Sequence, residues 1–317
     1  MKKDQAWGIA SAVGAYTLWG FLPIYWKLIQ QIPALEILAH RIVWCLLFMG
    51  IVLFATRGML SFCQEIRSIA YQRKRLLGLV CAAALITLNW LIYIWAVNDN
   101  RIVETSLGYY INPLVSVFLG IIVLKERLTF WQTVAVVLAG LGVLNLTFNF
   151  GAFPWVSVSL AISFGLYGLV KKIVNIGAIT SITLETLLLS PLALIYIVYL
   201  QQQEVGAFDF GQSMITGMLI GSGIVTAIPM VLFSNSAIRL PLTVLGFIQY
   251  LSPTIALFIG VFLYHEPFSL THLISFSLIW LALGIFSLAR TRTFVRIEAI
   301  VMKTAKKYFS AKGEDYF

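Results

Sequence analysis

Charged residues are scarce in this sequence. Asp, Glu, Lys and Arg make up 11% of the 317 residues, whereas a soluble domain carries roughly 25%. Hydrophobic residues make up 60%, compared with roughly 45–50% in soluble domains. A water-soluble chain of this length cannot bury so much apolar surface in one core. The composition therefore excludes a soluble globular protein and favours one that is solvated by a lipid bilayer.

Cysteine and histidine are also few, with 3 residues of each. Cys45, Cys63 and Cys81 are scattered and form neither a metal-binding spacing nor a disulfide framework. The sequence contains no HExxH, no GxSxG and no glycine-rich phosphate loop. We therefore predict no metal, no cofactor and no enzymatic activity.

Acidic residues are fewer than basic ones, and the formal net charge is +9. Such a charge could indicate binding to nucleic acid. Lys and Arg, however, lie almost entirely between apolar segments and at the two ends of the chain, which is the distribution that sets membrane topology. We therefore expect a lipid bilayer, and no nucleic acid, as the large partner.

Ten apolar segments are long enough for membrane helices, which need about 20 residues. The first five are Ala6–Ile29, Ile37–Ala55, Leu76–Val97, Thr105–Leu124 and Phe130–Leu146. The second five are Phe153–Val170, Ile182–Leu200, Met214–Asn235, Val244–Tyr264 and Leu273–Ala289. The first segment is longer than the apolar region of a signal peptide, which has about 7–15 residues, so we predict that it is an uncleaved membrane helix.

Orientation follows from the positive charges, which are enriched in cytoplasmic loops. With the N-terminus in the cytoplasm, 19 of the 22 Lys and Arg residues lie on the cytoplasmic side. Only Arg101 lies in an outer loop, while Lys27 and Arg41 lie near the outer ends of the first two spans. We predict that both termini are cytoplasmic, which also requires an even number of spans.

An internal repeat relates the two halves of the chain. From Pro113 and Pro253 onward, matching residues keep an offset of 140; the pairs are Phe118 and Phe258, Gly120 and Gly260, Glu126 and Glu266, and Thr129 and Ser269. Upstream, Gly108 and Gly246 keep an offset of 138, so the second copy has two extra residues before its proline. A weaker match joins Trp19-Gly20 to Tyr167-Gly168 and Glu36 to Glu185.

The repeat spans five helices, and an odd number inserts the second copy in the opposite direction. We therefore predict an all-α membrane protein with ten helices in a 5+5 inverted-repeat bundle. The first repeat covers residues 1–148, the second covers 149–290, and 291–317 form a basic cytoplasmic tail, either a surface helix or a solvated segment. Many secondary transporters share this plan and bind solute near the midplane, between the halves.

Several segments together carry a resemblance to a known family: Tyr16 to Gly20 with Tyr25 and Lys27, Glu36 to Arg41, Asn89-Trp90 with Tyr93, Ser106 to Pro113, Lys125 to Leu128, and Gly246-Phe247 with Gln249-Tyr250 and Pro253. With these residues the chain resembles the EamA branch of the drug/metabolite transporter superfamily, and within it the RarD-type proteins, named for chloramphenicol sensitivity. The resemblance covers residues 7 to about 290. It implies ten helices in an inverted 5+5 arrangement and transport of small metabolites, without a settled substrate.

Ionisable residues at membrane depth are rare and mark candidate functional positions. Lys27, Glu36, His40 and Arg41 lie near the outer ends of the first two spans, and Glu36 and His40 share a helical face. We predict an outer gate, an anion site or a structural ion pair here. The second half repeats Glu36 as Glu185 but repeats neither His40 nor Arg41. Glu36 and Glu185 are also candidates for ion coupling, and proton antiport, uncoupled exchange and facilitated export stay open.

Neutral aromatic and amide residues near the middle of the spans are the candidate substrate-binding residues. An aromatic pocket with a few amides suits an amphipathic, weakly charged solute. Each amide could instead bond a neighbouring helix. The candidates are Trp19, Asn89, Trp90, Tyr93, Tyr110, Asn112, Tyr167, Gln249, Tyr250 and Ser252, with Tyr16 and Tyr109 at similar depth.

Pro113 and Pro253 occupy matching places in the fourth and ninth spans. Each removes a backbone hydrogen bond and kinks its helix, so the pair is predicted to form hinges or to be tolerated by packing. Gly217-x-x-x-Gly221 is a close-packing helix face that could serve a homodimer or a contact within the chain.

We interpret the sequence as a secondary transporter, and an exporter, of small amphipathic metabolites or drugs that works by alternating access in the bacterial cytoplasmic (inner) membrane. The alternatives are a facilitative channel and a membrane scaffold without transport activity. A channel would show no saturable counterflow, which distinguishes it from a carrier.

Overall fold

The structure is a computed structural model, and it describes residues 3–56, 58–99, 101–149, 153–209, 211, 213–265, 268–289 and 291–300. Over these ranges the chain consists of helices and their connections, and no strand is present. Ten segments are long and apolar enough to cross a membrane. The prediction of an all-α protein with ten candidate membrane helices is therefore confirmed.

The predicted spans match the observed helices closely. In the first half they are α1 (Lys3–Lys27), α2 (Ala34–Ala55), α4 (Arg73–Asn98), α5 (Ile102–Ile122) and α6 (Phe130–Asn149). In the second half they are α7 (Trp155–Val174), α8 (Ala178–Gln202), α9 (Ser213–Arg239), the ninth span and α12 (Leu270–Leu288). Long apolar runs form these helices because a helix satisfies every backbone polar group within itself, as lipid demands.

The ninth span is broken into α10 (Leu242–Gln249), α11 (Leu251–Phe258) and the π-helical turn η1 (Ile259–Leu263). The interruption falls at Tyr250, three residues before Pro253. Proline has no N–H to donate to the carbonyl of Gln249, and its ring collides with that carbonyl in a regular helix. The fourth span contains Pro113 but stays a single helix, α5. The two matching prolines therefore act differently on their helices.

One helix was not expected from the sequence. Helix α3 (Met59–Tyr71) lies in the segment between the second and third spans, which looked like a polar loop. It has 13 residues, too few to cross a bilayer, and only its Ile69 is buried. Apolar residues recur every three or four positions and therefore form one apolar face of the helix. Helix α3 packs against α2, α4 and α8.

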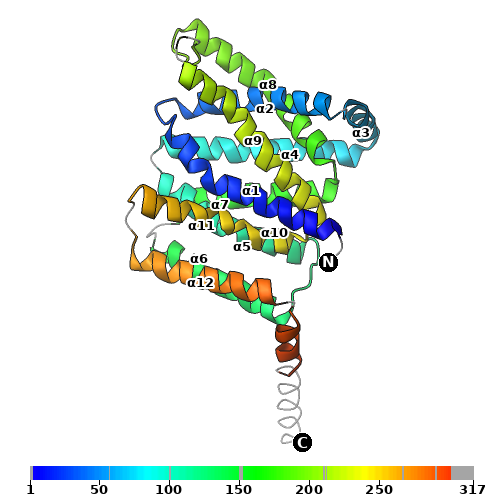
Figure 1. The fold of residues 1–317 in the computed structure, drawn as a ribbon, viewed down its shortest axis with the longest axis vertical. Helices are drawn as coiled ribbons and strands as arrows, with labels where there is room; N and C mark the ends of the chain where they lie inside the picture. The colour runs from blue at the N-terminus through cyan, green and yellow to red at the C-terminus, as the bar shows by residue number, and fades with distance from the viewer. Residues whose placement is uncertain are drawn as a thin grey trace, which may run out of the picture. The chain divides into compact units, whose positions relative to one another are not determined.

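The helices group into two compact units. Unit 2 consists of residues 125–153 and 268–317, and within it α6 and α12 lie side by side (Figure 1). Their contact is close, because a Cβ at Gly142 would lie 2.8 Å from the carbonyl oxygen of Ser275. The helical segment 292–300 contacts α6 through Trp131, whose Nε1 donates to the carbonyl of Phe294. Residues 301–317 of the predicted tail lie outside the described residues.

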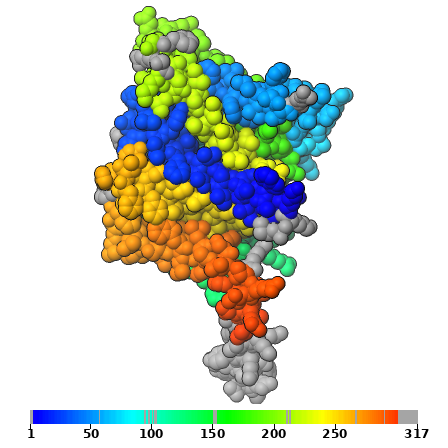
Figure 2. Space-filling view, in the orientation of Figure 1, coloured from blue at the N-terminus to red at the C-terminus, as the bar shows by residue number. Residues whose placement is uncertain are grey.

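Unit 1 consists of residues 1–124 and 154–267 and holds the other eight spans. Here α1 packs against α9 and α11, α4 and α5 pack against α7, and α2 packs against α8 and α9. Figure 2 shows α1 lying between α9 and α11 on the visible face. Each span has a counterpart five spans away in the other half. When both helices of a contact are replaced by their counterparts, the contact α1–α9 corresponds to α4–α7, α1–α11 to α5–α7, and α2–α9 to α4–α8. All six of these contacts are present.

Candidate functional site

Unit 1 has two ends that carry different polar contacts. We call the end at which α1 begins the inner end and the end at which α1 finishes the outer end, in keeping with the predicted orientation. At each end, a connecting segment of one half contacts the start of a helix in the other half.

At the outer end, Glu36 in the first turn of α2 accepts a hydrogen bond from the backbone N–H of Ala207 at 2.6 Å. Ala207 lies in the connection between α8 and α9. One turn further along α2, the ring of His40 stacks on Phe208 of the same connection, with centroids 5.1 Å apart. Trp44, one further turn along α2, also stacks on Phe208, and we call Glu36, His40, Trp44, Ala207 and Phe208 the outer clamp.

The outer clamp contains buried polar atoms without partners among the described residues. They are Glu36 Oε2, both ring nitrogens of His40, and Nε1 of Trp44, whose ring also stacks on Phe208. Such atoms are uncommon because each loses its hydrogen bonds to water on burial. The outer clamp is therefore held mainly by one hydrogen bond and by aromatic stacking.

At the inner end, Glu65 of α3 accepts hydrogen bonds from Gly177 N at 2.7 Å and from Thr180 Oγ1 at 2.6 Å. Both donors lie at the start of α8. Arg75 of α4 lies 3.7 Å from the Glu65 carboxylate and donates to the carbonyl of Asn175 at 3.0 Å. We call Glu65, Arg75, Gly177 and Thr180 the inner clamp.

A buried ion pair lies behind the inner clamp. Lys171 of α7 pairs with Glu185 of α8 and donates to Ser181 Oγ at 2.7 Å. Glu185 also accepts from the hydroxyls of Ser181 and Tyr167, each at 2.8 Å. Both charged side chains are 3% exposed. Unlike Glu36, Glu185 therefore has a cationic partner and both of its oxygens are bonded.

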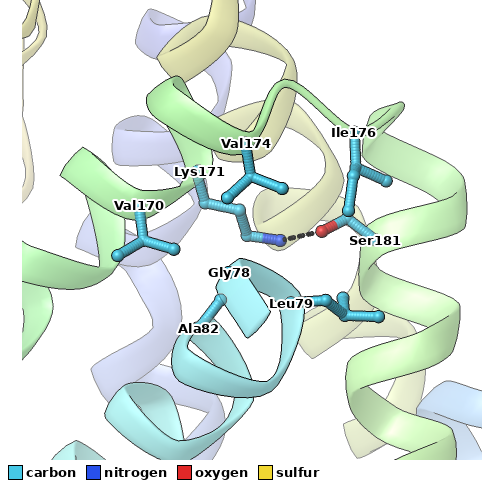
Figure 3. Close-up of a pocket in the computed structure, with 8 residues that line it drawn as sticks. All are labelled: Gly78, Leu79, Ala82, Val170, Lys171, Val174, Ile176 and Ser181. Carbon is cyan, nitrogen blue, oxygen red and sulfur yellow. Dashed lines mark hydrogen bonds between the residues drawn. The ribbon is translucent and has the colours of Figure 1, made fainter. Parts of the chain in front are cut away.

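A small pocket, with a cavity volume of about 10 Å³, adjoins this ion pair (Figure 3). Figure 3 shows Lys171 reaching across it to Ser181, with α4 on the opposite side. The helices are close here, because a Cβ at Gly78 would collide with the side chain of Val174. The pocket is lined by Gly78, Leu79, Ala82, Val170, Lys171, Val174, Ile176 and Ser181. Its size suits a water-sized species rather than a metabolite.

Arg41 lies deeper in unit 1 than the outer clamp. Its Cζ is 4.8 Å from the centroid of the Trp26 ring on α1 and 5.6 Å from that of Trp90 on α4. Its Nε donates to Thr226 Oγ1, near the middle of α9, at 3.0 Å. We call Trp26, Arg41 and Trp90 the Arg41 cradle. No carboxylate among the described residues forms an ion pair with this guanidinium.

A second arginine has the same surroundings with one addition. Arg101 Cζ lies 4.9 Å from the centroid of Trp155 and 5.5 Å from that of Trp95, and we call these three residues the Arg101 cradle. Its Nε and Nη2 are each 2.6 Å from Oε1 of Glu104. Arg101 therefore lies beside a pair of tryptophans, whose ring centroids are 5.2 Å apart, and is neutralised by a carboxylate.

The predicted outer group of four ionisable residues is not joined by hydrogen bonds or ion pairs in the described part of the chain. Lys27 lies over the ring of Tyr264, 3.5 Å from its centroid. Glu36 and His40 belong to the outer clamp, and Arg41 belongs to its own cradle. The structure brings Arg41, Trp90 and Tyr93 together, since the Tyr93 hydroxyl lies within electrostatic range of the guanidinium.

Several other candidate binding residues lie in a packed aromatic core. Trp19 contacts Phe233 with centroids 5.6 Å apart, and Tyr167 stacks on the same ring at 5.8 Å. Gln249 accepts from the hydroxyl of Tyr16 at 3.4 Å, and both residues are buried. Around these residues the interior is filled by the chain's own side chains.

The remaining candidates have local roles in the structure. Asn89 donates to the carbonyl of Leu160 and to Ser163 Oγ, so it bonds α4 to α7. Asn112 is buried and accepts a hydrogen bond from Ser116 at 3.5 Å. Tyr250 is also buried, and its hydroxyl has no hydrogen-bond partner among the described residues. Tyr110 and Ser252 are partly exposed. These observations place them without assigning any of them to a solute.

The two prolines lie close to the contact between the fourth and ninth spans. A Cβ at Gly246 of α10 would lie 2.7 Å from the carbonyl oxygen of Pro113 in α5. Gly246 therefore permits this close crossing. In the Gly217-x-x-x-Gly221 motif, Gly221 faces the hydroxyl of Tyr25, whereas a Cβ at Gly217 would meet nothing within 4 Å. One glycine of the motif thus serves a contact within the chain.

Sequence reasoning missed three residues that the structure places in these sites. Glu65 escaped attention because its segment looked like a loop. Trp26 lies seven residues after Trp19, which puts both on one face of α1, and this spacing could have revealed it. Thr226 carried no signal, because a lone threonine in an apolar helix is common. Within the part of the chain that the structure describes, no group of three or more His, Cys, Asp or Glu could hold a metal ion.

Comparison with known proteins agrees with this architecture. A sequence profile of the EamA-like transporter family matches residues 6–148. The uncharacterized transporter YojE of Bacillus subtilis (strain 168) is 45% identical over 285 residues, covering 90% of this chain and 95% of the relative. The chain belongs to the EamA-like transporter family. Its RarD-type relatives include Protein RarD of Streptomyces exfoliatus, 42% identical over 94% of this chain and 93% of the relative.

Other relatives of this EamA-like transporter are more distant. Protein RarD of Escherichia coli (strain K12) is 38% identical, covering 90% of this chain and 95% of the relative. A protein crystal structure superimposes with a TM-score of 0.68 at 16% identity, covering 91% of this chain and 99% of the other, and shows a shared fold. The family and the relative YojE carry the names of transporters, and the chain has ten helices that could span a membrane, so this EamA-like protein is a multi-pass membrane transporter rather than an enzyme.

Proposed function

We propose that this transporter is a secondary carrier that exports small amphipathic metabolites or drugs across the bacterial cytoplasmic membrane by alternating access. It consists of two inverted five-helix repeats, residues 1–148 and 149–290. The sequence repeat and the exchangeable helix contacts of unit 1 support this plan. The Chloramphenicol-sensitive protein RarD of Pseudomonas aeruginosa, 28% identical over 87% of this chain, supports a drug-like solute.

The observation that carries the proposal is the match between the two clamps. Each joins the connection after the second helix of one half to the start of the second helix of the other half. In the inner clamp the connection supplies the carboxylate, Glu65, and the helix start supplies the N–H of Gly177. In the outer clamp the helix start supplies the carboxylate, Glu36, and the connection supplies the N–H of Ala207. A carrier needs such a closure at each end and opens one at a time.

The first test distinguishes a carrier from the alternatives. Purified protein is screened by thermal shift against amino acids, nucleosides, aromatic metabolites and chloramphenicol, and each stabilising compound is tested for counterflow in liposomes. Saturable counterflow is expected. Flux without counterflow would indicate a channel, and absence of flux for every stabilising compound would indicate a scaffold.

The second test needs no substrate. Tyr109 lies within electrostatic range of Arg41, so Tyr109→Cys, in a background without the native cysteines, serves as the reporter of access to the interior. Glu65→Ala is expected to increase labelling from the inner side and reduce it from the outer side. Glu36→Ala should do the reverse. Parallel changes on both sides would contradict alternating access.

A further inference from the structure

The two tryptophan cradles each hold one arginine near two tryptophans, but they differ in whether a carboxylate is present. In both, the guanidinium carbon lies 4.8 to 5.6 Å from the centroids of two indole rings. These distances lie within the range of about 6 Å at which a cation is attracted to an aromatic face. Attraction to a ring leaves the N–H donors of a guanidinium available to an anion.

The Arg101 cradle shows what binds that edge. Glu104 Oε1 lies 2.6 Å from both Nε and Nη2 of Arg101, and the Glu104 side chain is only 7% exposed. The chain therefore neutralises an arginine that lies near two tryptophans with a carboxylate. Guanidinium and carboxylate groups match in charge and in planar shape, which makes this pairing strong.

The Arg41 cradle has no such carboxylate among the described residues. Among the described residues, its side chain donates one hydrogen bond, from Nε to the Thr226 hydroxyl, which carries no charge. An arginine has five N–H donors, and a charge at membrane depth without a counterion is costly. Arg41 therefore has the donors and the charge to hold an anion that the protein itself does not provide.

The position of Arg41 rules out a simple role at the lipid surface. It lies seven residues after Ala34, the first residue of α2, which corresponds to about 10 Å along the helix. Its partners come from α1, α4 and α9, so the side chain points into unit 1. Tyr93 and half-exposed Tyr109 lie within its electrostatic range and extend the aromatic surroundings.

We propose that Arg41 binds the carboxylate of the transported solute, and that the apolar part of this solute lies against Trp26, Trp90 and Tyr93. This inference rests on the proposed transport function and narrows its substrates to amphipathic organic acids. The solute carboxylate takes the place that Glu104 occupies beside Arg101. Thr226 orients the guanidinium through Nε and leaves its other nitrogens for the solute.

Matched ligand series test the proposal on the full chain in phosphatidylcholine nanodiscs. The probes are 3-phenylpropionate, 3-phenylpropionamide and 3-phenylpropylamine, together with the corresponding indole and short alkyl series. Binding is measured by thermal shift and by tryptophan fluorescence, with an equilibrium titration for each compound that responds. We expect carboxylates with an apolar body to bind, and the amide and amine of equal size to bind at least about tenfold more weakly.

Variants assign the binding to one residue. Arg41→Gln should abolish carboxylate binding, and Arg41→Lys should weaken it about tenfold, because an ammonium keeps the charge but loses the planar fork. The matched control is Arg101→Gln combined with Glu104→Gln, which alters the other cradle without leaving a charge unpaired. This control should bind the acids as the native protein does.

Three outcomes would overturn the proposal: equal binding of acid, amide and amine; unchanged acid binding in Arg41→Gln; or no binding by any acid. Competition from phosphatidylglycerol that depends on Arg41 would also overturn it, because the anion would then be a lipid headgroup. If Arg41→Gln fails to fold, the ligand series on native protein and Arg41→Lys decide. Failure of the transport proposal is distinct: acids would bind through Arg41 but show no counterflow.

Discussion

The two clamps of unit 1 differ in how well their polar groups are satisfied. Glu65 of the inner clamp has two hydrogen-bond donors and a nearby arginine, and the ion pair of Lys171 and Glu185 lies behind it. Glu36 of the outer clamp has one backbone donor and a buried oxygen without a partner among the described residues. The matching positions of Glu36 and Glu185 therefore do not give matching environments.

This difference predicts which of the two clamps is easier to separate. A buried polar atom without a partner destabilises the closed state by about 1–3 kcal/mol. The outer clamp contains four such atoms among the described residues, in Glu36, His40 and Trp44. The inner clamp residues contribute none. Among the described residues, the polar groups of the inner clamp are therefore better satisfied than those of the outer clamp.

The largest effect is expected at the inner ion pair. Lys171→Met leaves Glu185 buried without a cation, and removal of one partner of a buried ion pair destabilises by about 3–5 kcal/mol. Thermal unfolding of the purified protein should show a large drop in Tm. The double variant Lys171→Met with Glu185→Leu should recover most of it. A single variant as stable as the double one would contradict the role of the pair.

A smaller effect is expected for the inner clamp itself. Glu65→Gln removes the charge that accepts from Gly177 and Thr180, and hydrogen bonds to charged groups contribute about 1.5–3 kcal/mol. The carboxylate is 24% exposed, so we expect the lower end of that range. Chemical unfolding measures the change. Arg67→Gln on the same helix is the control and should change stability less.

The outer carboxylate should be less sensitive than the inner one. In Glu36→Gln the amide oxygen still accepts from Ala207, so we expect a loss of less than about 1 kcal/mol in unfolding free energy. The comparison with Glu65→Gln in one unfolding series tests the asymmetry directly. An equal or greater loss at Glu36 would mean that the outer clamp is as strong as the inner one.

The smallest effect is expected at His40, and it should have the opposite sign. His40→Phe keeps the stacking on Phe208 and removes two buried nitrogens without partners among the described residues. Stability should stay equal or rise by up to about 1 kcal/mol. Labelling at Tyr109→Cys from the outer side should fall at the same time. A clear loss of stability would show that the imidazole has a polar partner in the closed state.

The positions of the helices were predictable because hydropathy and length are local properties. All ten predicted spans correspond to helical segments, including the broken ninth span, whose extra residues before Pro253 were visible in the repeat. Helix α3 was missed because it is short and half polar. Its Glu65 was therefore absent from the candidate residues, although it forms the central contact of the inner clamp.

The candidate site was predictable only in part. Polar residues at membrane depth directed attention to Arg41, Trp90 and Tyr93, which the structure brings together. The same reasoning selected Tyr167 and Gln249, which lie in the packed core. A polar or aromatic residue near the middle of a span can face a neighbouring helix or an accessible space, and this depends on the rotation of each helix.

By itself, the sequence determined that this chain is a ten-span membrane protein with a repeated half, because apolar length and repeat register are properties of the linear chain. Only the tertiary structure decided which charges find partners. Arg101 and Glu104 are three residues apart and pair locally, whereas Arg41 meets Thr226 from 185 residues away and has no carboxylate partner in the described chain. Contacts of that kind depend on the depth and rotation of packed helices, which no single segment specifies.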